Sequence, residues 1–486
     1  MPRLAAAFLL GALCVAGFAP FHFFLLTILS VAGLIRLWSG EAKDSGWIGF
    51  SFGMGLFLCG VSWIYVSLHD FGGMPLSVAA AATVLFCAFL SLYPALVGFF
   101  QARLPGSPAT KAVLLTPALL ALEDWLRGWL FTGFPWLALG YSQTDSPLAG
   151  YAPILGAYGL SLITAVAGGL LFLATKTAYR KKAAILFALV FLCGYGLQKI
   201  DWTHPEGPPV TVSLLQGNIP QDRKWSNDEL ESTMDIYLKL ALSSKSRLII
   251  LPETAIPIFY DEVPREYLNM LEAHARENHG DVLIGLPERL TENEYYNGVF
   301  NFGLSPHERY RKSHLVPFGE FLPVKPVFGW LLDFMHIPMS DFSRGSLDQQ
   351  PIHAAGERLA IDICYEDVFG EEVILQLPQA TMLINVTDDA WFGDSIAPRQ
   401  HLQISRMRAL ETGRMMLRAT NTGMTAVVDA HGRLVSELPT FMQGSLDASV
   451  QGYSGATPYV SWGNHAFLLL AGAMLLLGLA KSRKNK

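Results

Sequence analysis

The sequence has few charged residues, and they are unevenly distributed. Only 16% of its 486 residues are Asp, Glu, Lys or Arg, while 51% are apolar; average soluble domains have about 25% charged residues. Residues 1–200 and 465–480 are nearly free of charge, whereas residues 201–463 have the composition of a globular domain. We therefore expect a membrane protein with one sizeable soluble domain before its last span. The net charge of −6 does not suggest nucleic-acid binding.

The soluble segment contains a single cysteine. Cys14, Cys59, Cys87 and Cys193 lie in apolar runs, so Cys364 has no disulfide partner within its own domain. A lone thiol in an oxidising compartment is a liability unless it has a function, although a buried structural cysteine is the plainer alternative. The histidines are scattered and no Cys/His cluster has metal-ligand spacing. A glycine-rich phosphate loop and a Gly-x-Ser-x-Gly elbow are missing from the soluble segment. No metal and no cofactor are expected.

Apolar runs long enough to cross a bilayer, about 20 residues each, predict transmembrane helices. Seven lie in a membrane domain of residues 1–200, and an eighth lies with a basic tail in residues 464–486. The runs are near 4–19, 21–37, 46–67, 76–101, 112–131, 151–175, 183–199 and 464–480. The first run is also compatible with a cleaved signal peptide, although another span follows Pro20 directly.

Lys and Arg are missing from every second loop. The loops around residues 20–21, 68–75 and 132–150 have none, whereas the termini and the alternate loops are basic. Because basic loops remain in the cytoplasm, both termini are expected there. Residues 201–463 then lie on the outer face of the membrane, which is the periplasm in a cell that has one.

Glu123, Asp124 and Arg127 are the only clustered charges within an apolar run. Charges inside a membrane are candidates for function. Glu123 and Arg127 are also spaced to neutralise each other on one helix face, and we give this structural interpretation slight preference.

Strands and helices alternate in residues 201–463. Strands are expected at 210–216, 247–251, 281–286, 299–303, 359–363, 381–386, 426–429 and 433–438, and helices at 227–243, 263–279, 367–376 and 399–413. Several strands are apolar throughout, as expected when both faces of a sheet are covered. This pattern favours a layered α/β sandwich, in which Ala430-His431-Gly432 forms a hairpin turn.

Three strand ends carry reactive groups. Cys364 follows the apolar strand 359–363, Glu253 follows Leu-Ile-Ile-Leu-Pro, and Lys312 lies in the segment 310–320, which ends in Glu320. A carboxylate that takes the thiol proton, an ammonium that stabilises an oxyanion and the sulfur nucleophile are the components of covalent acyl transfer.

Each of these residues also has a plainer interpretation. Glu253 is followed by Thr254, as is typical near the start of a helix, and Lys312 lies in a basic run typical of solvated charges. As a base, Glu253 has to lie within hydrogen-bonding reach of the thiol, in a site dry enough to raise its pKa. An ammonium beside Cys364 is expected to lower the thiol pKa.

These motifs carry a resemblance to known proteins. Leu-Pro-Glu-Thr at 251–254, the Lys312 segment and Cys-Tyr-Glu at 364–366 resemble the Glu-Lys-Cys motifs of the nitrilase superfamily. With Gln-Gly-Asn-Ile-Pro at 216–220, Ala-Trp-Phe-Gly-Asp-Ser at 390–395 and the eight spans, the whole chain resembles the apolipoprotein N-acyltransferase family.

The resemblance implies a multi-pass α-helical membrane domain and an extracytoplasmic nitrilase-like αββα sandwich. It implies that Glu253 is the general base, Lys312 the oxyanion-stabilising cation and Cys364 the nucleophile. Four further residues are implied to support the site: Glu320, Trp225, Tyr365 and Glu366. At Asp388 the family pattern leads us to expect Asn, and the extra carboxylate is expected near the surface.

The implied reaction transfers a fatty acyl chain from a phospholipid to the N-terminal amine of the diacylglyceryl-cysteine of apolipoproteins. It passes through a Cys364 thioester and completes lipoprotein maturation at the bacterial inner membrane. The expected acting unit is a monomer, without nucleic acid. A membrane-tethered amidase with the same three residues, and a transporter with an outer sensor domain, are the alternatives. The apolar segment 326–339 is expected to be either a flap at the membrane interface or ordinary core.

Overall fold

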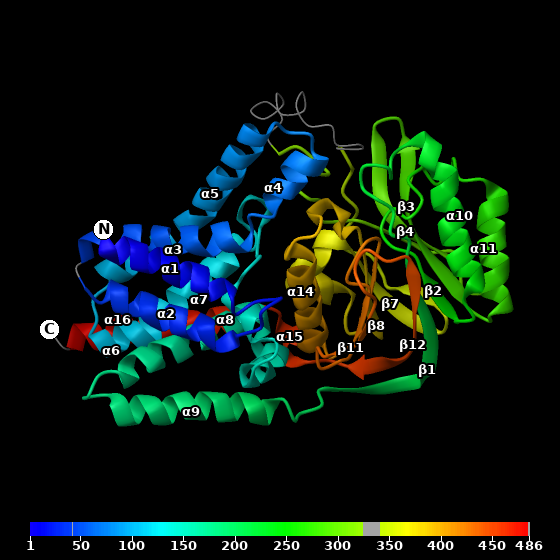
Figure 1. Ribbon diagram of the computed structural model, residues 1–486. Coiled ribbons are helices and arrows are strands. Elements are labelled where there is room, and N and C mark those ends of the chain that lie inside the picture. Colours follow the sequence, from blue (N-terminus) through cyan, green and yellow to red (C-terminus); the bar gives the residue numbers. More distant parts are fainter. Residues whose placement is uncertain (41, 324–340, 485–486) are drawn as a thin grey trace. The chain divides into compact units, whose positions relative to one another are not determined.

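The chain forms two compact units in the computed structural model, which describes residues 1–40, 42–323 and 341–484 (Figure 1). The helical unit comprises Met1–Tyr65, Leu76–Asp201 and Thr457–Lys486. The sheet unit comprises Val66–Pro75 and Trp202–Ala456. The division of the chain into domains at residues 200 and 463 stays a prediction.

Each apolar run of the sequence contains a helix of the helical unit. The helices are α1 (Pro2–Val15), α2 (Phe24–Trp38), α3 (Ser45–Gly60), α5 (Leu76–Arg103), α7 (Thr116–Arg127), α8 (Ala152–Ala174), α9 (Arg180–Leu197) and α16 (His465–Lys484).

Within the described residues, three helices are long and apolar enough to cross a membrane: Leu76–Arg103, Pro147–Ala174 and His465–Ser482. The pair Ser45–Gly60 and Ile64–Phe71 passes the same test as one span bent by 59°. The remaining apolar helices α1 and α2 are shorter, and the number of spans stays a prediction.

The charge cluster in α7 anchors the loop that follows it. Arg127 is buried and pairs with Asp124 at 2.6 Å, and its Nη1 donates to the carbonyl oxygens of Phe134 and Trp136. Glu123 is the more distant partner, at 3.8 Å. Because the guanidinium satisfies carbonyls of an irregular loop, the structure favours the structural interpretation of this cluster, with Asp124 rather than Glu123 as the main partner.

Two six-stranded sheets form the centre of the sheet unit (Figure 1). The first has the order β12-β1-β2-β3-β4-β5 and the second β11-β10-β9-β8-β7-β6. The first contains β1 (Thr203–Gln216), β2 (Leu248–Ile250), β3 (Asp281–Thr291), β4 (Glu294–Gly303), β5 (Arg309–Arg311) and β12 (Gly444–Gly455). The second contains β6 (Ile352–Ala354), β7 (Glu357–Ile363), β8 (Met382–Thr387), β9 (Met416–Thr420), β10 (Ala426–Val428) and β11 (Leu434–Glu437).

Both faces of the first sheet are covered, which explains its continuous apolar strands. Leu248 and Ile250 of β2 pack in a core cluster with residues of the second sheet, such as Ile361 of β7. Ile249 points the other way, since strand side chains alternate, and packs in a second cluster with residues of α10 (Asn227–Ser243) and α11 (Arg265–Glu277).

Helix α14 (Ala397–Thr412) lies against the outer side of the second sheet (Figure 1). The layer order is therefore helix, sheet, sheet, helix, as the nitrilase resemblance implied. The expected strands and the hairpin at 430–432 are present, whereas β5, β6, β9 and β12 were not expected. The helix expected at 367–376 is broken into short turns around α13 (Gly370–Val373).

Candidate active site

The three predicted catalytic residues lie at the ends of strands of the two packed sheets. Glu253 follows β2, Lys312 directly follows β5, and Cys364 directly follows β7. Nζ of Lys312 lies 3.3 Å from Oε1 of Glu253 and 2.8 Å from Oε1 of Glu320. The ammonium is therefore held between two carboxylates, and Glu320 contacts Lys312 directly.

Glu253 is fixed by the strand beside it. Asn297 of β4 donates to its Oε1 at 2.7 Å, and the backbone N–H of Asp388 donates to its Oε2 at 2.9 Å. The backbone at Pro252 and Glu253 also lies very close to β3, which a glycine at position 285 permits. A Cβ at Gly285 would lie 2.2 Å from the carbonyl oxygen of Pro252 and 2.9 Å from Cα of Glu253. The carboxylate is thus pre-oriented by the side chain of Asn297 and the backbone of Asp388.

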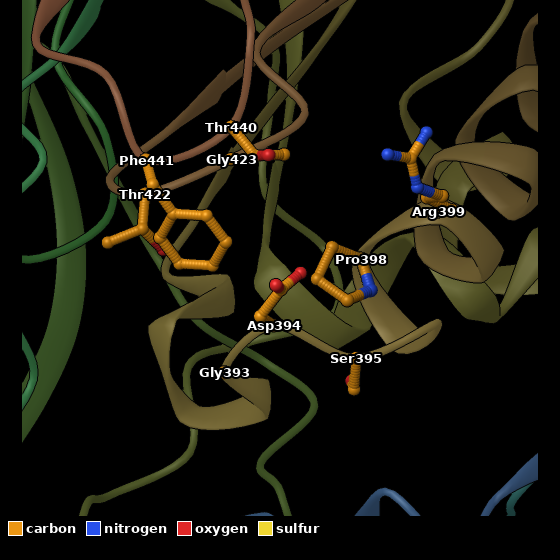
Figure 2. A pocket seen from close by; sticks show the side chains of 9 residues that line it. All are labelled: Gly393, Asp394, Ser395, Pro398, Arg399, Thr422, Gly423, Thr440 and Phe441. Carbon is orange, nitrogen blue, oxygen red and sulfur yellow. The ribbon is translucent and has the colours of Figure 1, made fainter.

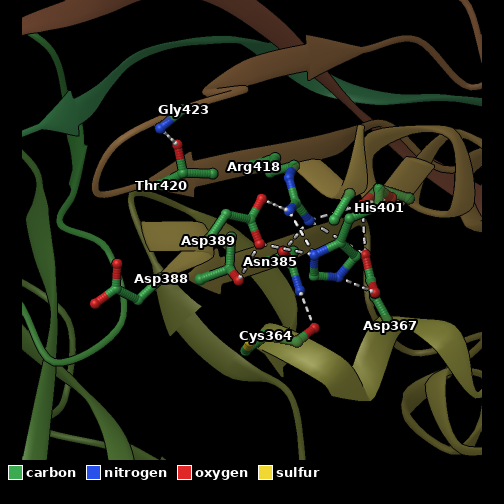
Figure 3. Close-up of polar contacts among 12 residues, drawn as sticks. Cys364, Asp367, Asn385, Asp388, Asp389, His401, Arg418, Thr420 and Gly423 are labelled. Atoms are coloured by element: carbon green, nitrogen blue, oxygen red, sulfur yellow. Dashed lines mark hydrogen bonds and ion pairs between the residues drawn. The ribbon is translucent and has the colours of Figure 1, made fainter. Parts of the chain in front are cut away.

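Cys364 occupies a sharp turn between β7 and the short helix η8 (Cys364–Val368). Its φ of 55° lies in the left-handed region, which costs a residue with a Cβ about 1–2 kcal/mol. The carbonyl oxygen of Cys364 accepts a hydrogen bond from Nδ2 of Asn385 at 3.1 Å (Figure 3). Cys364 as a whole residue is intermediate in exposure.

The charges of the site determine the resting protonation states. Burial raises the pKa of the Cys364 thiol well above its ordinary value, and Glu253 raises it further against the opposing effect of Lys312. Burial also disfavours the charged form of Glu253, but Lys312 and Lys224 hold its pKa below the ordinary value. Burial disfavours the Lys312 ammonium, yet Glu253 and Glu320 raise its pKa. The resting site therefore contains a protonated thiol, an ionised carboxylate and an ammonium.

Lys312 lowers the thiol pKa and burial raises the pKa of Glu253, as the sequence led us to expect, but the net direction at each group is the opposite. The two ammonium groups outweigh burial at Glu253, whereas burial and the carboxylate outweigh the single ammonium at Cys364. An ionised base beside a protonated thiol is the combination that general-base catalysis needs.

The supporting residues have different positions. Oε1 of Glu366 accepts from the backbone N–H groups of Ser313 and His314, and its Oε2 accepts from that of Ile363. Glu366 therefore ties the strand end before Cys364 to the segment after Lys312. The ring of Tyr365 packs against Phe369.

Trp225 is half-buried and directly follows Lys224. Its Nε1 is buried and has no hydrogen-bond partner among the described residues. Tyr365 directly follows Cys364 in the short helix η8. The segment 326–339, expected to be a flap or core, lies outside the described residues.

A buried polar network adjoins the turn at Cys364 (Figure 3). We call it the Arg418 network; it comprises Asp367, Asn385, Asp389, His401, Ser405 and Arg418. Arg418 donates to Oδ1 of Asn385 at 2.6 Å and to Oδ2 of Asp389 at 2.7 Å. It thereby connects the amide that holds Cys364 with the loop whose backbone contacts Glu253. Nothing in the local sequence predicted this network.

The position of Asp388 corrects a further expectation. Asp388 is 5% exposed rather than near the surface, and it forms an ion pair with the equally buried Lys224. Lys224, Asn297 and Asp388 were missed as site residues because nothing in their local sequence places them beside Glu253.

A small pocket of the sheet unit lies apart from these residues (Figure 2). It is lined by Gly393, Asp394, Ser395, Pro398, Arg399, Thr422, Gly423, Thr440 and Phe441. None of the three catalytic candidates lines it.

Family comparisons agree with this architecture. Residues 10–170 match the apolipoprotein N-acyltransferase N-terminal domain, and residues 211–459 match the carbon–nitrogen hydrolase family. An apolipoprotein N-acyltransferase of Nitrosomonas europaea is 54% identical over 98% of this chain and 97% of its own. One of Methylococcus capsulatus is 46% identical over 98% of this chain and 95% of its own. One of Vibrio cholerae is 40% identical over 100% of this chain and 98% of its own. The chain is therefore an acyltransferase with a carbon–nitrogen hydrolase domain, and it belongs to the apolipoprotein N-acyltransferase family.

Proposed function

We propose that the enzyme moves a fatty acyl chain from a membrane phospholipid to the N-terminal amine of the diacylglyceryl-cysteine of apolipoproteins. It acts as a monomer in the bacterial inner membrane and uses Cys364 as an acyl carrier. The placement of the Lys312 ammonium between Glu253 and Glu320, at a strand end of the same sandwich as Cys364, is the main support. Membership of an acyltransferase family speaks against the transporter alternative.

In the first half-reaction, the ionised Glu253 takes the proton of the Cys364 thiol as the sulfur attacks the ester carbonyl of the phospholipid. Lys312 stabilises the negative oxygen of the tetrahedral intermediate. The intermediate then expels the lysophospholipid, whose oxygen receives the proton from Glu253. An acyl thioester on Cys364 remains.

In the second half-reaction, the amine of the diacylglyceryl-cysteine attacks the thioester carbonyl. Glu253 accepts a proton from the attacking nitrogen, and Lys312 again holds the oxyanion. The C–S bond breaks, an amide forms, and the sulfur recovers its proton from Glu253. Glu320 has no direct step; its hydrogen bond at 2.8 Å keeps the ammonium in place.

The test is mass spectrometry of the protein incubated with phospholipid. A fatty acyl adduct on Cys364 is expected, absent from Cys364→Ala and strongly reduced in Lys312→Met. Addition of a diacylglyceryl-cysteine peptide should discharge the adduct into an amide. A thioester that water discharges at the same rate without the peptide would favour the amidase alternative, and the absence of any adduct would refute the proposal.

We also propose eight membrane spans, both termini in the cytoplasm, and residues 201–463 in the periplasm. The distribution of Lys and Arg among the loops supports this orientation. Alkaline phosphatase, which is active only outside the cytoplasm, should be active when fused after residue 70 or residue 145 and inactive after residue 107. The opposite pattern would refute the orientation.

A further inference from the structure

Glu253 has a second cation beside it that the proposed reaction does not use. Nζ of Lys224 donates to the backbone carbonyl oxygen of Glu253 at 3.2 Å and forms an ion pair with Asp388. Lys224 is 3% exposed and Asp388 is 5% exposed. A buried ion pair is costly to form and often no better for stability than an apolar pair, so its place beside the candidate base calls for a functional explanation.

Asp388 contacts the same carboxylate through its backbone. Its N–H donates to Oε2 of Glu253 at 2.9 Å, while its side chain receives Lys224 and Nδ2 of Asn421. The pair therefore holds Glu253 at two points, the main-chain oxygen and one carboxylate oxygen. The lysine is separated from Asp388 by 164 positions in the sequence, so the contact depends on the tertiary fold.

We propose that Lys224 and Asp388 are paired positioning residues that fix the carboxylate of Glu253 and set the pH range in which it accepts the thiol proton. This inference rests on the proposed role of Glu253 as the base. It assigns a function to the position where the family pattern led us to expect Asn, because the Asp388 carboxylate partly neutralises Lys224.

Several charged or titratable groups act on Glu253 together. Lys312 with Glu320 approaches from the segment after β5, Cys364 from the turn after β7, and Lys224 with Asp388 from two further loops. Tyr237 also faces Asp388 from α10. Lys224 favours the ionised form of Glu253, and the negative charge of Asp388 opposes that effect.

Opposite charge changes should therefore move the pH profile in opposite directions. Asp388→Asn keeps the N–H and the shape but leaves the charge of Lys224 unneutralised, which favours ionised Glu253. The acid limb of the pH profile, where the rate of Cys364 acylation falls on acidification, should therefore move to lower pH. Lys224→Met leaves Asp388 facing Glu253, so the limb should move to higher pH by about one unit, the scale of a single charge at this range. The double variant should lie near the parent. A residue that serves only packing would not produce opposite shifts.

The measurement is the rate of acyl-adduct formation on Cys364 from phospholipid vesicles, followed across pH in detergent-solubilised full-length protein. Lys224→Arg keeps the cation and should retain the parent profile. Asp235→Asn with Lys239→Met removes a matched but exposed pair and should change nothing. Thermal unfolding reports whether each variant is folded; if Lys224→Met is not, Asp388→Asn and Lys224→Arg still decide.

An unchanged acid limb in folded Asp388→Asn, or shifts of both single variants in the same direction, would overturn the inference. A parent enzyme that forms no adduct at any pH would instead refute the proposed function, so the two failures are distinguishable.

Discussion

Removing the guanidinium of Arg418 should destabilise the sheet unit and loosen the catalytic turn. Arg418 is fully buried, as are its partners Asp367 and Asp389, to which its nitrogens lie at 3.5 and 2.7 Å. In Arg418→Met, two buried carboxylates would keep His401 as their shared cationic or hydrogen-bonding partner. Breaking a buried charge pair from one side costs about 3–5 kcal/mol, which lowers the melting temperature of a unit of this size by about 10 °C.

The loss should depend on pH with a defined sign. Burial raises the pKa of Asp389, but Arg418 and His401 hold it below its ordinary value. In the parent the ionised carboxylate therefore stabilises the fold above its unfolded pKa of about 4, and this contribution is lost as the pH falls. Without Arg418, burial should raise the pKa instead, so ionised Asp389 destabilises the fold at neutral pH and protonation relieves it. The deficit relative to the parent should shrink as the pH is lowered from about 7.5 to about 5.5.

The assay is thermal unfolding of full-length protein in detergent at several pH values. The rate at which iodoacetamide alkylates Cys364 is measured on the same proteins. This rate should also change, because Arg418 supports Asn385, whose side chain donates to the carbonyl oxygen of Cys364. Arg276→Met is the control, since Arg276 makes an exposed pair with Glu272, and exposed pairs contribute about 0–1 kcal/mol. An Arg418→Met protein that melts within about 2 °C of the parent, or whose deficit grows on acidification, would refute the reasoning.

Three further outcomes follow from the site. Glu320→Gln weakens a charge-assisted hydrogen bond to Lys312, and such a bond contributes about 1.5–3 kcal/mol. Acyl-adduct formation should therefore slow by about 10- to 100-fold, and an unchanged rate would exclude a supporting role for Glu320. Gly285→Ala places a Cβ 2.9 Å from Cα of Glu253 and should lower the same rate in folded protein, whereas Gly196→Ala, with open space around it, should not. Because the pKa of Glu253 lies below its ordinary value of 4.5, the parent rate should stay level as the pH falls and decline only below about 4.5.

The catalytic candidates were visible in the sequence because each breaks a simple pattern. Cys364 directly follows the largely apolar strand β7, and Glu253 follows the apolar strand β2 and Pro252. The layered sandwich was predictable from strands such as β2, which is apolar on both faces. Lys312 was less distinct, because its strand β5 is only three residues long and lies in a basic run.

The missed features depend on contacts between distant segments. Strand β9 was missed because the buried Arg418 interrupts its apolar pattern, and β12 because its residues alternate without a clear buried face. Asp388 pairs with Lys224 in the interior rather than lying near the surface, because two distant segments meet there only in the folded chain. The pKa directions likewise depend on contacts between distant segments: two lysines outweigh burial at Glu253, whereas burial and Glu253 outweigh Lys312 at Cys364.

The charge balance of the site explains how a thiol with a raised pKa can still act as a nucleophile. Lys224 and Lys312 are enclosed with the carboxylates of Glu253, Glu320 and Asp388. Ionising Cys364 to bulk water would add a negative charge to a buried cluster that already has an excess carboxylate. Transfer of the proton to Glu253 moves the negative charge within the cluster and leaves the total charge unchanged. This transfer therefore avoids the cost of adding a further buried charge, which is the cost that raises the thiol pKa. Glu253 must be ionised before this transfer, and the two lysines favour that state.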